Sequence, residues 1–170
     1  MNCMFPFLTK INIYPKSYLE IGVAEGHTLA AAVSGWELEE LVLCDNWTGK
    51  YGGMKRENHQ HIEFLLGQLH FPLEKVTFLD GASQIVIPEY FAQDPDRSYF
   101  DVIFIDGDHS PYGLMCDLHN TINHAKIIII HDMKHSEHLY LSDVVYSFYK
   151  SIWRDYTLII DHDLGYLAKR

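Results

Sequence analysis

The chain alternates short apolar runs with longer segments in which apolar residues recur every three or four positions. The short runs, each of a length typical of a strand, lie at 18–21, 41–44, 76–79, 102–105 and 127–130. The run at 102–105 is apolar throughout, as expected for a strand that is covered on both faces. Because helical segments separate these runs, the sequence predicts an α/β fold with a doubly wound, mostly parallel sheet.

Helices are predicted at about 27–33, 62–69, 83–91, 111–122 and 141–152. In the second of these, Ile62, Leu66 and Leu69 share one face, which is the pattern of a helix packed on a core. Ser110 and Pro111 form a helix start, because a hydroxyl caps the free N–H groups and proline at the first position loses no hydrogen bond.

The end of the chain predicts a hairpin. Two apolar runs, 157–160 and 166–168, flank the polar turn 161–165, and such a hairpin adds one antiparallel strand to the sheet. The length of 170 residues suits one domain, so we expect a single domain over 1–170 in which 1–16 is an N-terminal extension.

Charge and cysteine usage narrow the function classes. Thirteen Lys and Arg stand against 23 Asp and Glu, a net charge of −10, which disfavours nucleic acid or an anionic membrane surface as partner. Cys3, Cys44 and Cys116 form no disulfide framework, residues 1–10 do not resemble a signal peptide, and the aliphatic run 127–130 is too short to cross a bilayer. We therefore expect a cytoplasmic protein.

Polar residues follow most of the predicted strands, at the edge where such sheets bind ligands. After the first strand, Gly22 and Gly26 allow a tight turn and a close approach of backbone to ligand, although a plain loop would look similar. Their GxxxG spacing differs from the GxGxxG of dinucleotide oxidoreductases, which counts against NAD. Asp45 and Asn46 follow the second strand, where a carboxylate suits the hydroxyls of a ribose, or serves only as a cap or turn residue.

After the third strand, Ala82 is small enough to admit a flat base, and the polar groups of Ser83 and Gln84 suit the edge of that base. Ser83 also fits the N-cap position of the next helix, and the two roles are compatible.

The fourth and fifth strands end in Asp106, Asp108 and His109, and in His131 and Asp132. Single residues of these types are usually solvated or capping, but neighbouring parallel strands would bring the two groups together. Carboxylates with an imidazole suit a divalent cation, so we predict a metal site here.

The remaining histidines lack partners at a diagnostic spacing and are interpreted as surface residues; they include His59, His61, His119, His124, His135 and His138. Of the aromatic residues, Trp47 and Tyr51 are predicted to edge a substrate pocket.

These segments resemble a known family. Residues 18–26 resemble the first motif of class I S-adenosylmethionine (SAM)-dependent methyltransferases, and 76–88 resemble the matching stretch of catechol O-methyltransferase. Residues 104–110 with 130–132 resemble the metal-dependent sugar and macrolide O-methyltransferases and the cephalosporin-hydroxylase-like group. The resemblance implies a Rossmann-like, seven-stranded, mostly parallel sheet with an antiparallel C-terminal hairpin strand.

The resemblance also implies roles for residues. Glu20 and Gly22 would lie beside the methionine part of SAM, and Gly26 would begin the following helix. Asp106 would also bind the cofactor. Asp45, with Asn46, would hold the ribose hydroxyls, and the adenine would be framed by Ala82, Ser83 and Gln84. A divalent metal, Mg²⁺ or Mn²⁺, would be bound by Asp106, His131 and Asp132, and His109 would be the general base.

Three departures from the family pattern stand out. His131 replaces a residue that is more often a carboxylate, and His124–Ala125 replaces a frequent Gly-Gly. The chain also begins close to its first strand, so the cover over the substrate would come from 1–16, from the loop 47–55 or from another subunit of a homo-oligomer.

The implied activity is methylation of a hydroxyl on a small molecule such as a sugar, a phenol or a secondary metabolite. A metal-dependent hydrolase or phosphoesterase is the first alternative, but it leaves Gly22, Asp45 and Ala82 unexplained. A non-catalytic SAM-binding partner subunit is the second.

Overall fold

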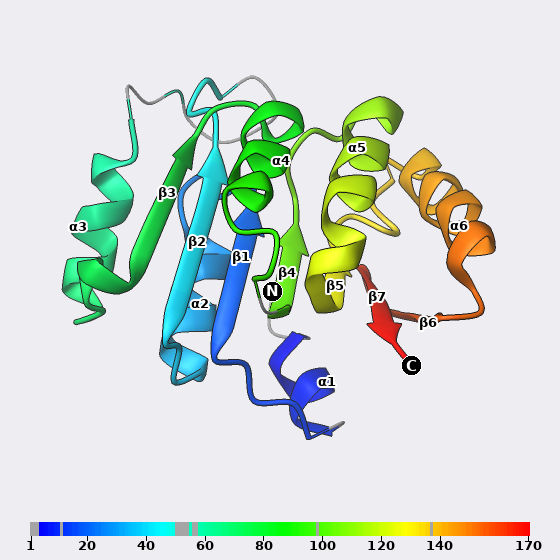
Figure 1. Ribbon diagram of the computed structural model, residues 1–170, viewed down its shortest axis with the longest axis horizontal. Coiled ribbons are helices and arrows are strands. Elements are labelled where there is room, and N and C mark those ends of the chain that lie inside the picture. The colour runs from blue at the N-terminus through cyan, green and yellow to red at the C-terminus, as the bar shows by residue number, and fades with distance from the viewer. Residues whose placement is uncertain (1–3, 11, 50–54, 56–57, 98, 137) are drawn as a thin grey trace.

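The computed structural model describes residues 4–10, 12–49, 55, 58–97, 99–136 and 138–170. Its centre is a seven-stranded sheet in the order β3-β2-β1-β4-β5-β7-β6 (Figure 1). The strands are β1 (Ser17–Ile21), β2 (Glu40–Asp45), β3 (Val76–Asp80), β4 (Phe100–Ile105), β5 (Ala125–Ile130), β6 (Tyr156–Asp161) and β7 (Leu164–Lys169). Strands β1 to β5 pair in parallel, whereas β7 is antiparallel to both β5 and β6. The predicted fold class, including the antiparallel C-terminal strand, is confirmed.

Helices cover both faces of the sheet. They are α1 (Met4–Lys10), α2 (His27–Gly35), α3 (Gln60–Gln68), α4 (Ser83–Gln93), α5 (Pro111–Thr121) and α6 (Tyr140–Ile152), with short 3-10 turns at Leu73–Lys75 and Ile122–His124. One face carries α4, α5 and α6, and the other carries α1, α2 and α3 (Figure 1). Within the part of the chain described, none of these helices is long and apolar enough to span a membrane.

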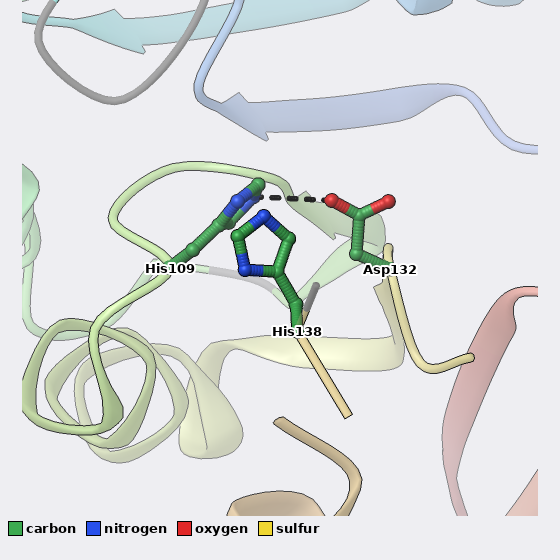
Figure 2. A group of neighbouring side chains, drawn as sticks. All are labelled: His109, Asp132 and His138. Atoms are coloured by element: carbon green, nitrogen blue, oxygen red, sulfur yellow. Dashed lines mark ion pairs between the residues drawn. The ribbon is translucent and has the colours of Figure 1, made fainter. Parts of the chain in front are cut away.

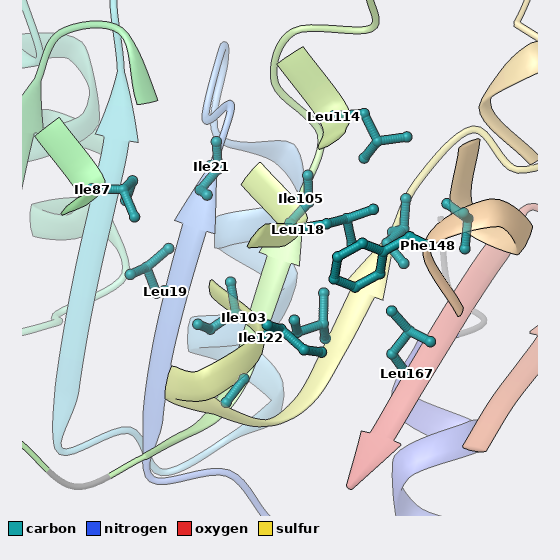
Figure 3. Packing of buried hydrophobic residues seen from close by; sticks show 14 of the residues in the cluster. Leu19, Ile21, Ile87, Ile103, Ile105, Leu114, Leu118, Ile122, Phe148 and Leu167 are labelled. Atoms are coloured by element: carbon teal, nitrogen blue, oxygen red, sulfur yellow. The ribbon is translucent and has the colours of Figure 1, made fainter. Parts of the chain in front are cut away.

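The two faces of the sheet have separate hydrophobic cores because side chains alternate along each strand. Leu19 and Ile21 of β1 face α4 and α5, together with Ile103 and Ile105 of β4 (Figure 3). Tyr18, which precedes Leu19 in β1, faces the opposite core, where Leu29 of α2 is buried. Burial on both faces accounts for the continuous apolar runs of the central strands.

Two helix starts follow different rules. The α5 start is as predicted: the Ser110 hydroxyl accepts a hydrogen bond of 3.0 Å from the backbone N–H of Gly113, and Pro111 occupies the first helical position. In α4 the interpretation of Ser83 as the N-cap was wrong, because Ala82 is the cap residue and Ser83 is the first residue of the helix. The side chain of Ser83 is buried at the start of α4.

The N-terminal segment packs on the sheet through α1. Met4 and Leu8 are buried in the core on that face, and the ring of Phe7 stacks on Tyr166 of β7 with the centroids 3.9 Å apart. The described residues of 1–16 thus cover the sheet face beside α2.

Candidate active site

A cavity of about 240 Å³ lies at the carboxyl ends of the parallel strands. Strand β1 has β2 on one side and β4 on the other, so the direction of chain progression reverses there, and open α/β sheets bind ligands at such a point. Among the predicted site residues the cavity is lined by Gly22, Asp45, Asn46, Ala82, Ser83, Gln84, Asp106, Asp108, His109, His131 and Asp132. The fold therefore brings together residues that are far apart in the sequence.

The glycine loop is held tightly by the protein itself. Gly22 has a φ of +87°, and a Cβ atom there would collide with the backbone of Asp106. Gly26 precedes α2 with a φ of +77°, and a Cβ there would meet Leu65 and Ile62 of α3. Both positions require glycine, and the close approach that they permit is to neighbouring elements of the fold.

Glu20 and Gly26 do not line the cavity. The Glu20 side chain is buried on the α2 side of the sheet, where its Oε2 accepts a hydrogen bond of 2.9 Å from the Tyr18 hydroxyl. Burial raises the pKa of Glu20 to about 8, although the Tyr18 hydrogen bond acts in the opposite direction. Glu20 is thus a buried, proton-binding carboxyl directly behind the glycine loop.

Asp45 connects two loops at the cavity wall. Its Oδ2 accepts a hydrogen bond of 2.9 Å from the backbone N–H of Ala24, and its Oδ1 accepts one of 2.7 Å from that of Trp47. Asn46 caps the same turn, with its Oδ1 accepting a hydrogen bond of 3.0 Å from the N–H of Thr48. The carboxylate is therefore fixed in orientation before any ligand arrives.

Trp47 and Tyr51 were predicted to edge the pocket. Trp47 is buried and donates from Nε1 to Asp80 Oδ1 over 2.8 Å, and it is absent from the cavity lining. Tyr51 lies outside the described residues.

His59 and His61, interpreted as surface residues, are half-buried and make specific contacts. Nδ1 of His59 lies 2.9 Å from Asp80 Oδ1, and its ring stacks on Phe78. Nε2 of His61 lies 2.8 Å from the carbonyl oxygen of Ala24. Both imidazoles therefore support loops that carry the cavity wall.

Asp106, His131 and Asp132 form a compact group at the other end of the cavity. Nδ1 of His131 lies 3.1 Å from Asp106 Oδ1 and 3.1 Å from Asp132 Oδ1. One ligand atom from each residue falls within 4.8 Å of the other two, a spacing suited to a metal ion. The predicted juxtaposition of the fourth and fifth strand ends is present in the fold.

His109 projects into the same end of the cavity. Its Nε2 lies 3.2 Å from Asp106 Oδ1 and 3.6 Å from Asp132 Oδ2. The hydrogen bond with Asp106 raises the pKa of His109 against the opposing effect of burial, and the same cause raises the pKa of His131. Burial alone would raise the pKa of Asp106, but its hydrogen bonds with the two imidazoles hold that pKa below its usual value.

His138, interpreted from the sequence as a surface residue, lies beside this group. It follows a tight turn after β5, and a ligand atom of its ring falls within 4.8 Å of ligand atoms on His109 and Asp132. Figure 2 shows the rings of His109 and His138 and the Asp132 carboxylate gathered around one point. The available signal was the density of histidine after the fifth strand, at His131, His135 and His138.

A second cavity of about 180 Å³ shares His131 with the first. It is otherwise lined by Met4, Thr28, Phe104, His162, Asp163 and Leu164. Of the proposed covers, the described part of 1–16 contributes Met4 to this second cavity and nothing to the larger one. The loop 47–55 contributes Gly49 to the larger cavity, while its residues 50–54 lie outside the described residues.

A doubly wound sheet with a glycine loop after β1, an acidic residue at the end of β2 and a cavity at the strand switch is typical of α/β enzymes that bind nucleotide cofactors. Residues 19–133, more than half of the chain, match the sequence profile of a family described as a methyltransferase domain. The chain belongs to this family and is a SAM-dependent methyltransferase. Membership sets aside the hydrolase.

Several solved methyltransferases have the same fold. CalS11, a TDP-rhamnose 3′-O-methyltransferase of calicheamicin biosynthesis, superposes with a TM-score of 0.73 at 14% identity, covering 97% of this chain and 76% of CalS11. The O-methyltransferase NovP gives a TM-score of 0.70 at 15% identity, with 97% and 76% covered. MycE in complex with Mg and SAH gives 0.64 at 14% identity, covering 96% of this chain and 49% of MycE. Comparison with curated protein sequences gives no match.

Proposed function

We propose that the protein transfers the methyl group of SAM to a hydroxyl of a small molecule with the assistance of a divalent metal ion. The observation that carries the proposal is the continuity of one cavity: Asp45 and Ala82 line it together with Asp106, His109 and Asp132. Residues suited to a nucleoside and residues suited to a cation thus face the same space. CalS11 is a sugar O-methyltransferase and MycE binds Mg, which supports the same chemistry on this fold.

In this proposal SAM lies across the end of β1. The fixed carboxylate of Asp45 accepts hydrogen bonds from the ribose hydroxyls, with Asn46 beside it, and the adenine lies against Ala82, Ser83 and Gln84. The methionine part runs past Gly22 towards Asp106. Glu20 and Gly26 act from outside the cavity, where they shape the loop that carries Gly22.

The residues at the other end of the cavity fit a divalent cation. Asp106 and Asp132 supply carboxylate oxygens and His131 an imidazole nitrogen, a donor set compatible with Mg²⁺ and, because of the nitrogen, better suited to Mn²⁺. When bound, such an ion lowers the pKa of a hydroxyl and fixes its orientation. The replacement of a carboxylate by His131 lowers the negative charge of the site by one.

His109 is the proposed general base. Its Nε2 faces the cavity beside Asp106 and accepts the proton of the acceptor hydroxyl, and the carboxylate stabilises the imidazolium that forms. The acceptor oxygen forms its new bond to the methyl carbon while the S–CH₃ bond breaks. The electron pair of that bond stays on sulfur, so the products are the methyl ether, S-adenosylhomocysteine (SAH) and a proton on His109.

The proposed acceptor is a small molecule, with no role for nucleic acid or a membrane. The chain carries a net charge of −10, which repels phosphate backbones and anionic surfaces.

Calorimetric titration of the EDTA-treated protein with SAH tests the cofactor site. Asp45→Asn is the sharpest variant, because the amide oxygen keeps one of the two loop hydrogen bonds while the charge is lost. We expect weaker SAH binding by Asp45→Asn and unchanged binding by Asp96→Asn, an exposed aspartate used as the matched control. Wild-type protein that is folded and does not bind SAH would refute the proposed placement.

A methyl-transfer assay tests the acceptor class. Sugar nucleotides, phenols and hydroxylated macrolides are offered with SAM, with and without Mg²⁺ or Mn²⁺, and SAH formation is measured. Transfer to a hydroxyl that requires the metal supports the proposal, and equal transfer in EDTA contradicts the metal's role.

A further inference from the structure

We propose that His109, Asp132 and His138 form a second cation site, which binds a divalent transition ion of the zinc class. This ligand set overlaps that of Asp106, His131 and Asp132 in one residue, Asp132. It adds His138, a residue that has no part in the proposed methyl transfer.

The three side chains converge from two different segments. Nε2 of His109, which follows β4, lies 3.6 Å from Oδ2 of Asp132, which follows β5. The rings of His109 and His138 meet edge to face with centroids 4.8 Å apart, and His138 points towards the other two side chains (Figure 2). Ligand atoms on one ion with bonds of about 2.0–2.2 Å lie at most about 4.4 Å apart. A group within 4.8 Å is therefore close to a bound geometry.

Backbone hydrogen bonds hold His138 in place beside the site. The N–H of His138 donates to the carbonyl oxygen of His135 over 2.9 Å, and the N–H of Leu141 donates to that of His138 over 2.8 Å. Asp132 itself has a φ of 57°, a left-handed conformation that aspartate tolerates better than most residues. These hydrogen bonds join described residues that are close in the sequence.

The outer surroundings of the site match those of known metal-binding histidines. Ligating imidazoles usually hold their second nitrogen in a hydrogen bond, which fixes the ring orientation and the tautomer. Nδ1 of His138 lies 3.2 Å from the Tyr140 hydroxyl, which leaves Nε2 for an ion. The Asp132 side chain is 12% exposed and that of His109 is 22% exposed, so both are partly shielded while an ion keeps access.

The donor set selects the class of ion. Two imidazoles and one carboxylate are the ligands of many zinc and non-haem iron sites, whereas Mg²⁺ prefers oxygen ligands throughout. We therefore expect Zn²⁺ to bind the set that contains His138, and Mg²⁺ to bind in a way that does not depend on His138.

One consequence rests on the proposed function. Coordination by His109 uses the same nitrogen lone pair that would accept the proton of the acceptor hydroxyl. A zinc-class ion at this site therefore removes the general base and inhibits methyl transfer, even while Mg²⁺ or Mn²⁺ at the neighbouring ligand set supports it.

The test is metal binding by the EDTA-stripped protein, measured as competition between the protein and a chromophoric zinc chelator, and as visible absorption on addition of Co²⁺. We expect His138→Ala to weaken Zn²⁺ binding at least about tenfold, because even loss of an outer hydrogen-bond partner has an effect of about 10- to 100-fold. His135→Ala is the matched control, since its ring stacks on His138 but lies outside the ligand group, and we expect its Zn²⁺ affinity to equal that of the wild type.

Equal Zn²⁺ affinity of His138→Ala and the wild type overturns the proposal. It is also overturned if His131→Ala loses Zn²⁺ binding and His138→Ala retains it. Circular dichroism reports folding of each variant, and His138→Gln replaces His138→Ala if the latter unfolds. Because this readout requires no acceptor, zinc binding that depends on His138 stands even if no hydroxyl is methylated. Methyl transfer without such binding supports the proposed function alone.

Discussion

The main-chain carbonyl of Asp106 lies so close to Gly22 that it occupies the space a side chain at this position would need. This contact joins the two halves of the cavity, because Gly22 belongs to the loop after β1 and Asp106 to the end of β4. The distance between the proposed SAM subsite and the proposed metal ligands is thus set by backbone packing.

Gly22→Ala is expected to destabilise the protein by more than about 2 kcal/mol, because the left-handed backbone alone costs an L-residue about 1–2 kcal/mol and the collision adds to it. Gly67→Ala is the matched control: a Cβ there meets nothing within 4 Å, and in α3 it is expected to stabilise by up to about 1 kcal/mol. Urea unfolding measures both changes. Equal effects of the two substitutions would contradict the assignment of Gly22.

His109→Ala is expected to lower the turnover number by about 10²- to 10⁴-fold while leaving SAH affinity within a factor of about two, since the loss of a general base affects the chemical step. Steady-state kinetics and calorimetry separate the two quantities. His119→Ala, an exposed histidine on α5, is the control and should behave as the wild type. A parallel loss of SAH binding in His109→Ala would show instead that His109 holds the cofactor.

Asp132→Asn is expected to weaken Mn²⁺ binding at least about tenfold, because an amide oxygen lacks the charge of the carboxylate ligand. Electron paramagnetic resonance of free Mn²⁺ measures the affinity. Asp143→Asn, at an exposed position of α6, should not change it. If the wild type binds no Mn²⁺, then Asp106, His131 and Asp132 do not form the expected metal site.

The buried carboxyl of Glu20 predicts a pH-dependent stability. Its pKa rises from 4.5 to about 8 on folding, chiefly through burial, so the folded state binds more protons than the unfolded state between these values. Its contribution to stability is therefore fully present below pH 4.5 and is lost as the pH rises through about 8. Glu20→Gln, which keeps an acceptor for Tyr18, should show a flatter dependence of the unfolding free energy on pH.

Urea unfolding at a series of pH values measures this slope. Glu89→Gln, at an exposed position of α4, should retain the wild-type slope. Equal slopes in Glu20→Gln and the wild type would mean that another group titrates in this range.

Local signals were sufficient to predict the fold. The apolar runs gave the strands because both faces of the central strands are buried, and Ser110 with Pro111 marked the start of α5 through hydrogen bonding within a single turn. The placement of Glu20 was also within reach of such rules. Alternation along β1 puts it on the same face as Tyr18 and opposite Ile21, away from the cavity.

The candidate site was harder to predict from the sequence, because the positions of its residues depend more on tertiary structure. Asp106 and His131 were predicted to meet because neighbouring parallel strands end together. His138 was not, because its position follows from the left-handed turn at Asp132 and from hydrogen bonds that the sequence does not specify. His61 was missed for a related reason, since its contact with Ala24 depends on how α3 docks beside α2.

The turn of the C-terminal hairpin holds the segment that follows Asp132: the carbonyl oxygen of Asp163 accepts a hydrogen bond of 3.0 Å from the N–H of Met133, and its Oδ1 accepts one of 2.6 Å from that of Lys134. Asp163 comes later in the chain than every residue that lines the larger cavity. During synthesis on the ribosome, where the chain emerges N-terminus first, the glycine loop and β2 are complete before this anchor exists. The segment that carries the proposed SAM subsite therefore leaves the ribosome first, and the anchor beside the proposed metal ligands leaves it last.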